Sequence, residues 1–282
     1  MAVRGGRVWQ GTTVMSTLPA AEAAYLSAVV DRLRAVLGDT LLGLYPTGSL
    51  ALGGYTPGRS DLDLIAVVTH ADAAVLTDLV ARLSHDALPC PATGLEFVLY
   101  ERAALAVAGT GAGFALNLNT GRELPPKVSF GPGDEETFWY PIDRAISSQQ
   151  GWALLGPPPR TLLAPAPFAA LMPVVVESVA ARLRSDLDLG DNAVLNGCRS
   201  LRFATEGRWY AKRPAAEWAI GVVPEFAPLI RRALDSHRRG RPAGATVGGD
   251  ELRAFLAVVL DRLRRHGTAT GHEPGERPAP AH

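Results

Sequence analysis

The chain has 282 residues, of which 47% are hydrophobic and 20% charged, and its 28 basic and 28 acidic side chains cancel. A net charge of zero argues against a long nucleic-acid track, which needs a basic surface to displace counterions from phosphates. A small cationic ligand is still allowed, because it needs only a local acidic pocket. No apolar run approaches the roughly 18 residues of a membrane span, and residues 1–16 lack a signal-peptide core. We therefore expect a cytoplasmic protein in which Cys90 and Cys198, which form no metal-ligand or disulfide pattern, are reduced and buried.

The first part of the chain alternates between helical and strand patterns. We predict, in chain order, a helix at residues 18–37, a strand at 41–46, a short helix at 49–52, a strand at 61–68, a helix at 71–85 and a strand at 94–100. The strand at 61–68 is rich in Leu, Ile and Val, which is typical of a central strand. The strand at 94–100 alternates, with Glu96 on the face opposite Phe97. This order predicts an α/β domain with a small mixed sheet.

A less regular region follows. Residues 109–140 are rich in Gly, Asn and Pro, and the piece FALNLNTGRELPPKVSF is expected to pair as a short strand and then open into a loop. The pattern over residues 139–152 is helical, with Ile142 and Ile146 facing inward. The run Gly156-Pro157-Pro158-Pro159 is the clearest linker in the chain, so we place a domain boundary there.

Beyond the linker the pattern is all-helical. Five helices are predicted, at residues 167–186, 191–207, 214–222, 225–237 and 248–265. Residues 238–247 and the tail are polar and rich in Pro and Gly, which predicts mobility. The expected domains are a flexible N-terminus at 1–16, a first domain at 17–157, a helical bundle domain at 158–266 and a disordered tail at 267–282.

The strand at 61–68 begins with two acids. Asp61 and Asp63 are two residues apart, so on a strand their side chains point to the same face. Adjacent carboxylates repel each other unless a cation lies between them. The upstream Gly48-Ser49 turn leaves backbone N–H groups free beside a hydroxyl, which is an anion site. Turn and acids together predict a site for a triphosphate with Mg²⁺; the alternative is an edge strand with two solvated acids.

Glu96 is the third candidate acid. It lies on a strand that is otherwise apolar, so it asks for a reason. It could be a third metal ligand, or a base that takes the proton from an attacking hydroxyl. The alternative is an exposed residue on the solvated face of the sheet.

These acids and the turn resemble a known superfamily. Gly48-Ser49, then Asp61-Leu62-Asp63, then Glu96 on a later strand, resembles the nucleotidyltransferase superfamily that includes DNA polymerase β.

The C-terminal half narrows the resemblance. Residues 191–220, DNAVLNGCRSLRFATEGRWYAKRPAAEWAI, resemble the helical-domain signature of the aminoglycoside nucleotidyltransferases that adenylylate streptomycin and spectinomycin. Arg199 and Lys212, at their distance in the signature, point to this branch. The resemblance covers most of residues 20–235.

The resemblance implies an antibiotic-resistance enzyme that transfers AMP from ATP to a drug hydroxyl and releases pyrophosphate. Asp61 and Asp63 would hold two Mg²⁺, and Glu96 would be the general base. The nucleotide would be contacted by Gly48, Ser49, Ser60, Arg199 and Lys212. The last two would reach ATP from the helical domain; for Arg199 the alternative is an ion pair with an acid on its own helix.

The residues that would contact the drug are matched less closely. In these enzymes the loop after the general base carries an aromatic side chain that stacks on substrate, and here Asn117 and Asn119 stand near that place. Asp188 or Asp191 could grip drug amines, and Asp143 could face the cleft. Asp191 could equally cap the helix that it opens.

Three functions remain open at this point. The first is AMP transfer to an aminoglycoside or aminocyclitol. The second is the same chemistry on another small-molecule or protein hydroxyl, and the third is a non-catalytic nucleotide-binding regulator. Three converging acids argue against the third, because their repulsion costs stability without a metal. We expect a monomer whose partner is a small cationic drug, with no nucleic-acid or membrane partner.

Overall fold

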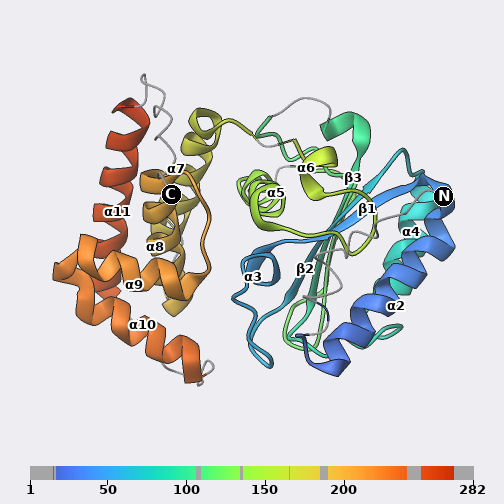
Figure 1. Cartoon of the computed structure of the whole chain (residues 1–282), viewed down its shortest axis with the longest axis horizontal. Coiled ribbons are helices and arrows are strands. Elements are labelled where there is room, and N and C mark those ends of the chain that lie inside the picture. Colours follow the sequence, from blue (N-terminus) through green and yellow to red (C-terminus); the bar gives the residue numbers. More distant parts are fainter. Residues whose placement is uncertain are drawn as a thin grey trace, which may run out of the picture. The chain divides into compact units, whose positions relative to one another are not determined.

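The computed structural model describes residues 15, 17–105, 109–133, 136–164, 166–184, 190–239 and 249–269. The chain forms two compact units, Met1–Ala166 and Pro167–His282 (Figure 1). The first unit includes residues 158–164, which the sequence analysis assigned to the second domain. Leu163 is fully buried there, in a cluster with Tyr45 and Tyr100.

The N-terminal unit is built on a five-stranded sheet in the order β1-β2-β3-β4-β5. The strands are β1 (Leu41–Pro46), β2 (Leu62–Val68), β3 (Leu95–Glu101), β4 (Leu116–Thr120) and β5 (Lys127–Ser129). β2 and β3 are parallel, whereas the other neighbours are antiparallel. A parallel pair needs a crossover, which the helix α4 (Ala73–Leu83) supplies. The predicted mixed sheet is confirmed, but the piece from Phe114 to Phe130 forms two strands rather than one.

The two faces of the sheet are covered differently. α2 (Ala20–Leu37) and α4 cover the face that carries Leu64 and Phe97 (Figure 1). α5 (Trp139–Gln150) lies over the opposite face, where Tyr140 packs with Ile65. Ile142 and Ile146 of α5 are buried, as predicted. The short elements are η1 (Gly38–Thr40), α3 (Gly48–Ala51), η2 (Arg102–Leu105) and α6 (Pro159–Leu162).

The C-terminal unit is all-helical, as predicted. Its elements are α7 (Phe168–Arg184), α8 (Asp191–Glu206), α9 (Lys212–Val222), η3 (Pro224–Phe226), α10 (Ala227–Arg239) and α11 (Gly249–Ala269). α8 is central, and Gly197 lets α11 approach it, since a Cβ there would meet the Phe255 ring at 2.8 Å. α9 begins at Lys212 rather than 214, because Pro214 is tolerated in the first turn of a helix.

Two predictions about mobile segments meet the structure only in part. α11 continues through Ala269, so the first residues of the predicted disordered tail are helical. The rest of that tail, most of the segment 238–247 and nearly all of residues 1–16 lie outside the described residues. Within the described part of the chain, no helix combines the length and the apolar character needed to cross a membrane.

Candidate active site

Three carboxylates converge at one end of the parallel strand pair. Asp63 of β2 lies directly beside Glu96 of β3 in the register, and Asp61 precedes Asp63 by two residues. One carboxylate oxygen from each residue lies within 4.8 Å of the other two. All three residues are half-buried, so the cluster is open to solvent on one side. The donors are hard oxygens that leave room for waters and phosphates, which is the environment that Mg²⁺ prefers.

The turn after β1 lies against this acid cluster. The Thr47 N–H donates to the Asp63 carbonyl at 2.9 Å, which fixes the turn beside β2. Gly48 has a φ of +53°, and a Cβ built on it would lie 1.9 Å from Oδ2 of Asp63. Only glycine therefore allows this close approach.

Ser49 supplies a second sign of a ligand at the turn. Its Oγ is buried and has no hydrogen-bond partner among the described residues. A buried hydroxyl without a partner costs about 1–3 kcal/mol. A phosphate oxygen at the start of α3 would remove that cost, so Ser49 fits an anion beside the acids.

Ser60 closes the turn that leads into Asp61. Its Oγ accepts the Thr56 N–H at 3.0 Å, and its own N–H donates to the Thr56 carbonyl at 2.9 Å. A serine hydroxyl that accepts one bond can still donate its proton. The predicted contact of Ser60 with a triphosphate is compatible with this geometry and stays a prediction.

α5 holds the glycine turn from behind. The Thr47 hydroxyl donates to the Asp143 carbonyl at 2.8 Å, and the Ser147 hydroxyl donates to the Pro46 carbonyl at 2.8 Å. Thr47 and Ser147 are almost fully buried. Asp143 thus lies on the helix turn that supports the anion site, with its side chain half-buried.

In the C-terminal unit, α8 and α9 hold the two cations expected to bind ATP. Arg199 donates from Nε to the Tyr210 carbonyl at 3.1 Å and from Nη1 to Oδ1 of Asn196 at 3.2 Å. Lys212 donates to Oδ1 of Asn192 at 2.6 Å. Asn192, Asn196 and Arg199 are spaced by four and three residues, so they lie on one face of α8 and bring the two cations together.

Known proteins resemble this chain in the C-terminal unit by sequence and over most of its length by fold. Residues 161–262 match the family model described as aminoglycoside adenylyltransferase, C-terminal domain. The fold is similar to a crystal structure of spectinomycin adenyltransferase AAD(9) from Enterococcus faecialis with ATP and spectinomycin. That match has a TM-score of 0.62 and 17% identity, and covers 86% of this chain and 98% of that one. Residues 161–262 thus resemble the C-terminal domain of aminoglycoside adenylyltransferases, and most of the chain shares the fold of AAD(9).

Two other comparisons carry no argument. The complex of the CD-NTase CdnG from Bradyrhizobium diazoefficiens with GTP matches with 16% identity over 90% of this chain and 73% of that one. Its TM-score of 0.25 is too low to carry an argument. A search of curated protein sequences gave no match.

On the sheet, the row of polar side chains continues beyond the acids. Asn119 of β4 lies directly beside Glu96 in the register, and Asn117 lies beside Val98. Both asparagines are therefore on the acid-bearing face of the sheet. Asn119 is half-buried and Asn117 is 6% exposed. Their predicted contacts with substrate stay a prediction.

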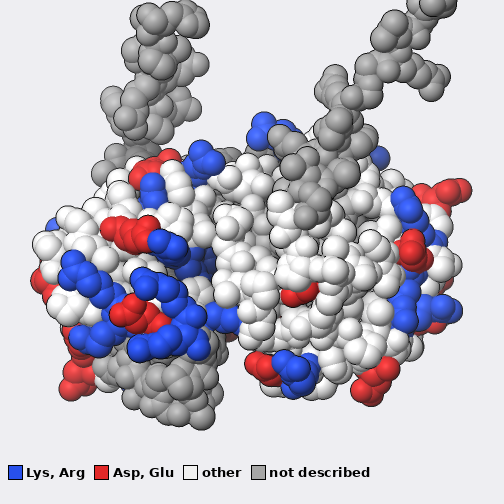
Figure 2. Space-filling view, turned by 60° about the horizontal axis from the view of Figure 1, so that its bottom comes forward, with Lys and Arg blue, Asp and Glu red and all other residues white. Residues whose placement is uncertain are grey.

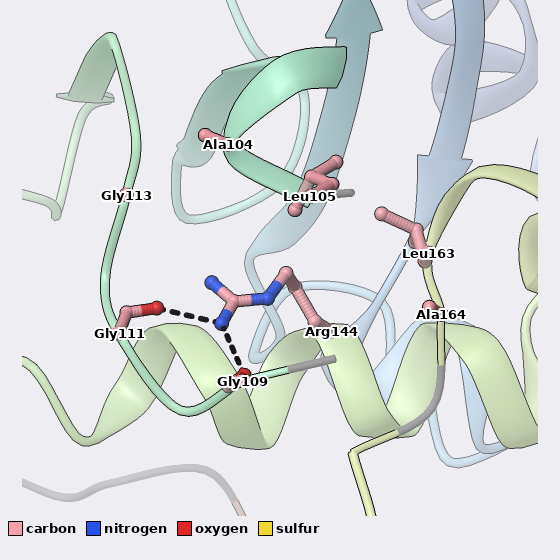
Figure 3. A pocket seen from close by; sticks show the side chains of 8 residues that line it. All are labelled: Ala104, Leu105, Gly109, Gly111, Gly113, Arg144, Leu163 and Ala164. Carbon is pink, nitrogen blue, oxygen red and sulfur yellow. Dashed lines mark hydrogen bonds between the residues drawn. The ribbon is translucent and has the colours of Figure 1, made fainter. Parts of the chain in front are cut away.

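Arg144 of α5 is a buried cation that the sequence did not single out. Its guanidinium donates to the carbonyls of Gly109 at 3.2 Å and Gly111 at 2.6 Å (Figure 3). It also donates to the Tyr100 hydroxyl at 3.2 Å and to the Ala112 carbonyl at 3.0 Å. A small pocket beside it is lined mainly by glycine, alanine and leucine residues. Because its terminal N–H groups already have acceptors, Arg144 clamps the loop that leads into β4.

Burial also sets the protonation of Tyr100 beneath this clamp. Burial raises the pKa of the Tyr100 phenol, Arg144 lowers it, and the nearby Asp143 carboxylate raises it again. The phenol therefore stays protonated. A buried arginine in a helix interior has no periodic signal, so only the tertiary structure could reveal this pair.

The start of α8 differs from one of the sequence-based alternatives. The N-cap residue of α8 is Gly190, so the alternative in which Asp191 caps the helix is wrong. Asp191 is the first helical residue and is 4% exposed, where its charge is favoured by the helix dipole. Asp188 lies outside the described residues.

Basic side chains gather on one face of the C-terminal unit, but acidic side chains lie among them (Figure 2). Arg202 pairs with Glu206 and Arg213 pairs with Glu217. This surface is one of mixed charge rather than a continuous basic track.

Proposed function

We propose that the protein transfers AMP from Mg-ATP to a hydroxyl of an aminoglycoside or aminocyclitol antibiotic of the streptomycin or spectinomycin class. The observation that carries the proposal is the convergence of three carboxylates beside a glycine turn whose serine hydroxyl is buried without a partner. The family-model match of residues 161–262 and the ATP complex of the similar structure support the same chemistry.

Asp61 and Asp63 are the residues that would hold two Mg²⁺, which would neutralise triphosphate charge and orient the α-phosphate. Gly48, Ser49 and Ser60 would bind phosphate oxygens. Arg199 and Lys212 would bind ATP through their positive charges.

Glu96 is the proposed general base, a role supported by its position beside Asp63 in the register but on a different strand. It accepts the proton of the drug hydroxyl while that oxygen attacks the α-phosphorus. The bond between the α-phosphorus and the bridging oxygen breaks, and pyrophosphate leaves. The drug becomes the AMP ester.

Recognition of the drug would combine charge and hydrogen bonding. Asp143, Asp188 and Asp191 are the acids proposed to attract drug amines. The amide of Asn119 has no hydrogen-bond partner among the described residues, so it can serve a drug hydroxyl next to Glu96. Asn117 is proposed to assist from the same face.

The test is acceptor-dependent pyrophosphate release. The protein is incubated with Mg-ATP and a panel of drugs that includes streptomycin and spectinomycin. Pyrophosphate release is followed, and the masses of the drug products are measured by mass spectrometry. We expect release with at least one drug, a product heavier by one AMP group, and loss of both in Asp63→Asn, whose circular dichroism should match the wild type. Release with no drug in the panel would contradict the antibiotic substrate.

A second variant tests whether Glu96 acts as a general base or as a metal ligand. Glu96→Gln should lower turnover by about 100-fold or more, in the range typical of a general base, while ATP binding stays nearly unchanged. Loss of ATP binding in this variant would make Glu96 a metal ligand instead.

A further inference from the structure

A fourth acid lies close to the site without belonging to the carboxylate cluster. Glu22, in the first turn of α2, is only 5% exposed. Its Oε1 accepts a hydrogen bond from the Tyr55 hydroxyl at 3.0 Å. A carboxylate that is buried on folding must be hydrogen-bonded, so this contact has a structural consequence for both residues.

Tyr55 immediately precedes the turn of residues 56–60, and Asp61 immediately follows it. Thr56 and Ser60 bind each other reciprocally, at 3.0 Å and 2.9 Å, and the Arg59 N–H donates to the Thr56 carbonyl at 3.1 Å. Residues 56–60 therefore form a closed loop. Tyr55 and Asp61 flank its two ends, so what anchors Tyr55 also limits where Asp61 can lie.

The surroundings keep this anchor in one protonation state. Burial raises the pKa of the Tyr55 phenol, and the bond to Glu22 raises it further, with smaller effects from Cys90 and Asp61. The hydroxyl therefore remains a donor.

We propose that Tyr55 and Glu22 are positioning residues for the metal site. Their hydrogen bond ties the closed loop of residues 56–60 to α2 and holds Asp61 in register with Asp63. This inference rests on the proposed metal role of the acid cluster. Neither residue touches the metal or the substrate in this scheme.

The hydrogen bond between Tyr55 and Glu22 would counteract the repulsion among the three carboxylates. Without a cation the three carboxylates repel one another, and Asp61 lies just before the first residue of β2 rather than within the strand. Asp63 and Glu96 lie within strands, whereas Asp61 lies before β2, where the backbone bonds of its neighbours Ser60 and Leu62 to Thr93 and Gly94 and the loop of residues 56–60 restrain it. Loosening Tyr55 should therefore displace Asp61 first.

The experiment measures Mn²⁺ binding by electron paramagnetic resonance, without nucleotide or drug. Tyr55→Phe keeps the ring but loses the donor, and Glu22→Gln keeps an acceptor oxygen but loses the charge. Tyr25→Phe is the matched control, because Tyr25 is a buried tyrosine of the same helix as Glu22 whose hydroxyl lies beside the Cys90 thiol rather than bonding a carboxylate. Near-UV circular dichroism confirms that each variant is folded.

We expect Tyr55→Phe to weaken Mn²⁺ binding about tenfold, as residues that orient metal ligands do. Glu22→Gln and Tyr25→Phe should stay within about threefold of the wild type, which is below that effect. Equal Mn²⁺ affinity in Tyr55→Phe and the wild type would overturn the positioning role. An equally large loss in Glu22→Gln would also overturn it, since charge rather than the hydrogen bond would then matter.

A further variant distinguishes failure of this inference from failure of the proposed function. Asp61→Asn should abolish most Mn²⁺ binding. If Asp61→Asn binds Mn²⁺ as the wild type does, the acid cluster is not the metal site, and both proposals are overturned together. If only Tyr55→Phe is unchanged, the metal site stands and the anchor alone is refuted.

Discussion

Replacement of Gly48 by alanine tests whether the glycine turn and the acid cluster form one site. The variant changes a single methyl group. At a φ of +53° a residue with a Cβ is strained by about 1–2 kcal/mol. The new Cβ would also lie 1.9 Å from Oδ2 of Asp63.

The contact, rather than the strain, should dominate the effect on turnover. To reach ordinary van der Waals distance, the Asp63 carboxylate or the turn must move by about 1.5 Å. A misplacement of about 1 Å in a catalytic site can cost about 100-fold. We therefore expect Gly48→Ala to lose about 100-fold in turnover and about 1–3 kcal/mol in the free energy of unfolding.

Gly53→Ala is the matched control. Gly53 is in the loop after α3 and has a φ of +67°, but a Cβ there would meet nothing within 4 Å. It should lose about 1–2 kcal/mol of stability and keep turnover within about twofold. Urea unfolding and pyrophosphate release are measured for both variants. If Gly48→Ala is as active as Gly53→Ala, the reasoning that links the turn to Asp63 is wrong.

Three further predictions concern other parts of the chain. Arg144→Lys should lower the free energy of unfolding by about 2–4 kcal/mol in urea, because an ammonium cannot reach acceptors spread around a planar guanidinium; a loss below about 1 kcal/mol would contradict the clamp. Lys212→Ala should weaken ATP binding in calorimetry by about tenfold, whereas Arg213→Ala, which removes an exposed cation next in sequence, should not; equal effects would remove Lys212 from the nucleotide site. Burial raises the pKa of the Cys90 and Cys198 thiols, so at pH 8 both should react with a disulfide reagent about 100-fold more slowly in the native than in the unfolded protein; rapid native reaction would contradict their burial.

The sequence predicted those parts of the site that follow from strand periodicity. Asp61 and Asp63 share a face because side chains alternate along a strand. Glu96 was recognisable as their partner because it is an acid within the apolar run of residues 94–100, and its carboxylate does lie with theirs. The helices of the C-terminal unit were predictable for a similar reason, since their apolar stripes recur every three or four residues.

Contacts that depend on tertiary structure were not predictable. Nothing local shows that Gly48 touches Asp63, because that contact depends on how the end of β1 meets the start of β2. Arg144 was missed because an arginine is normally exposed, and its acceptors lie in an irregular loop. β5 has only three residues, too few to show an alternating pattern.

Both backbone pairing and tertiary side-chain contacts hold the three mutually repulsive carboxylates together. Each of these acids comes from a chain segment that is restrained in a different way. The Thr47 N–H is bound to the carbonyl of Asp63, and Glu96 lies on a strand that is paired on both sides. Asp61 precedes its strand and is restrained by the backbone bonds of its neighbours Ser60 and Leu62 and by the loop tied to α2 through Tyr55. The first two restraints are backbone hydrogen bonds that any sequence of the right period can form. The third includes a side-chain contact between Tyr55 and Glu22, which are far apart in the chain. The acid with the least regular support is therefore the one whose position depends most on particular side chains, and substitutions outside the cluster should act on metal binding chiefly through Asp61.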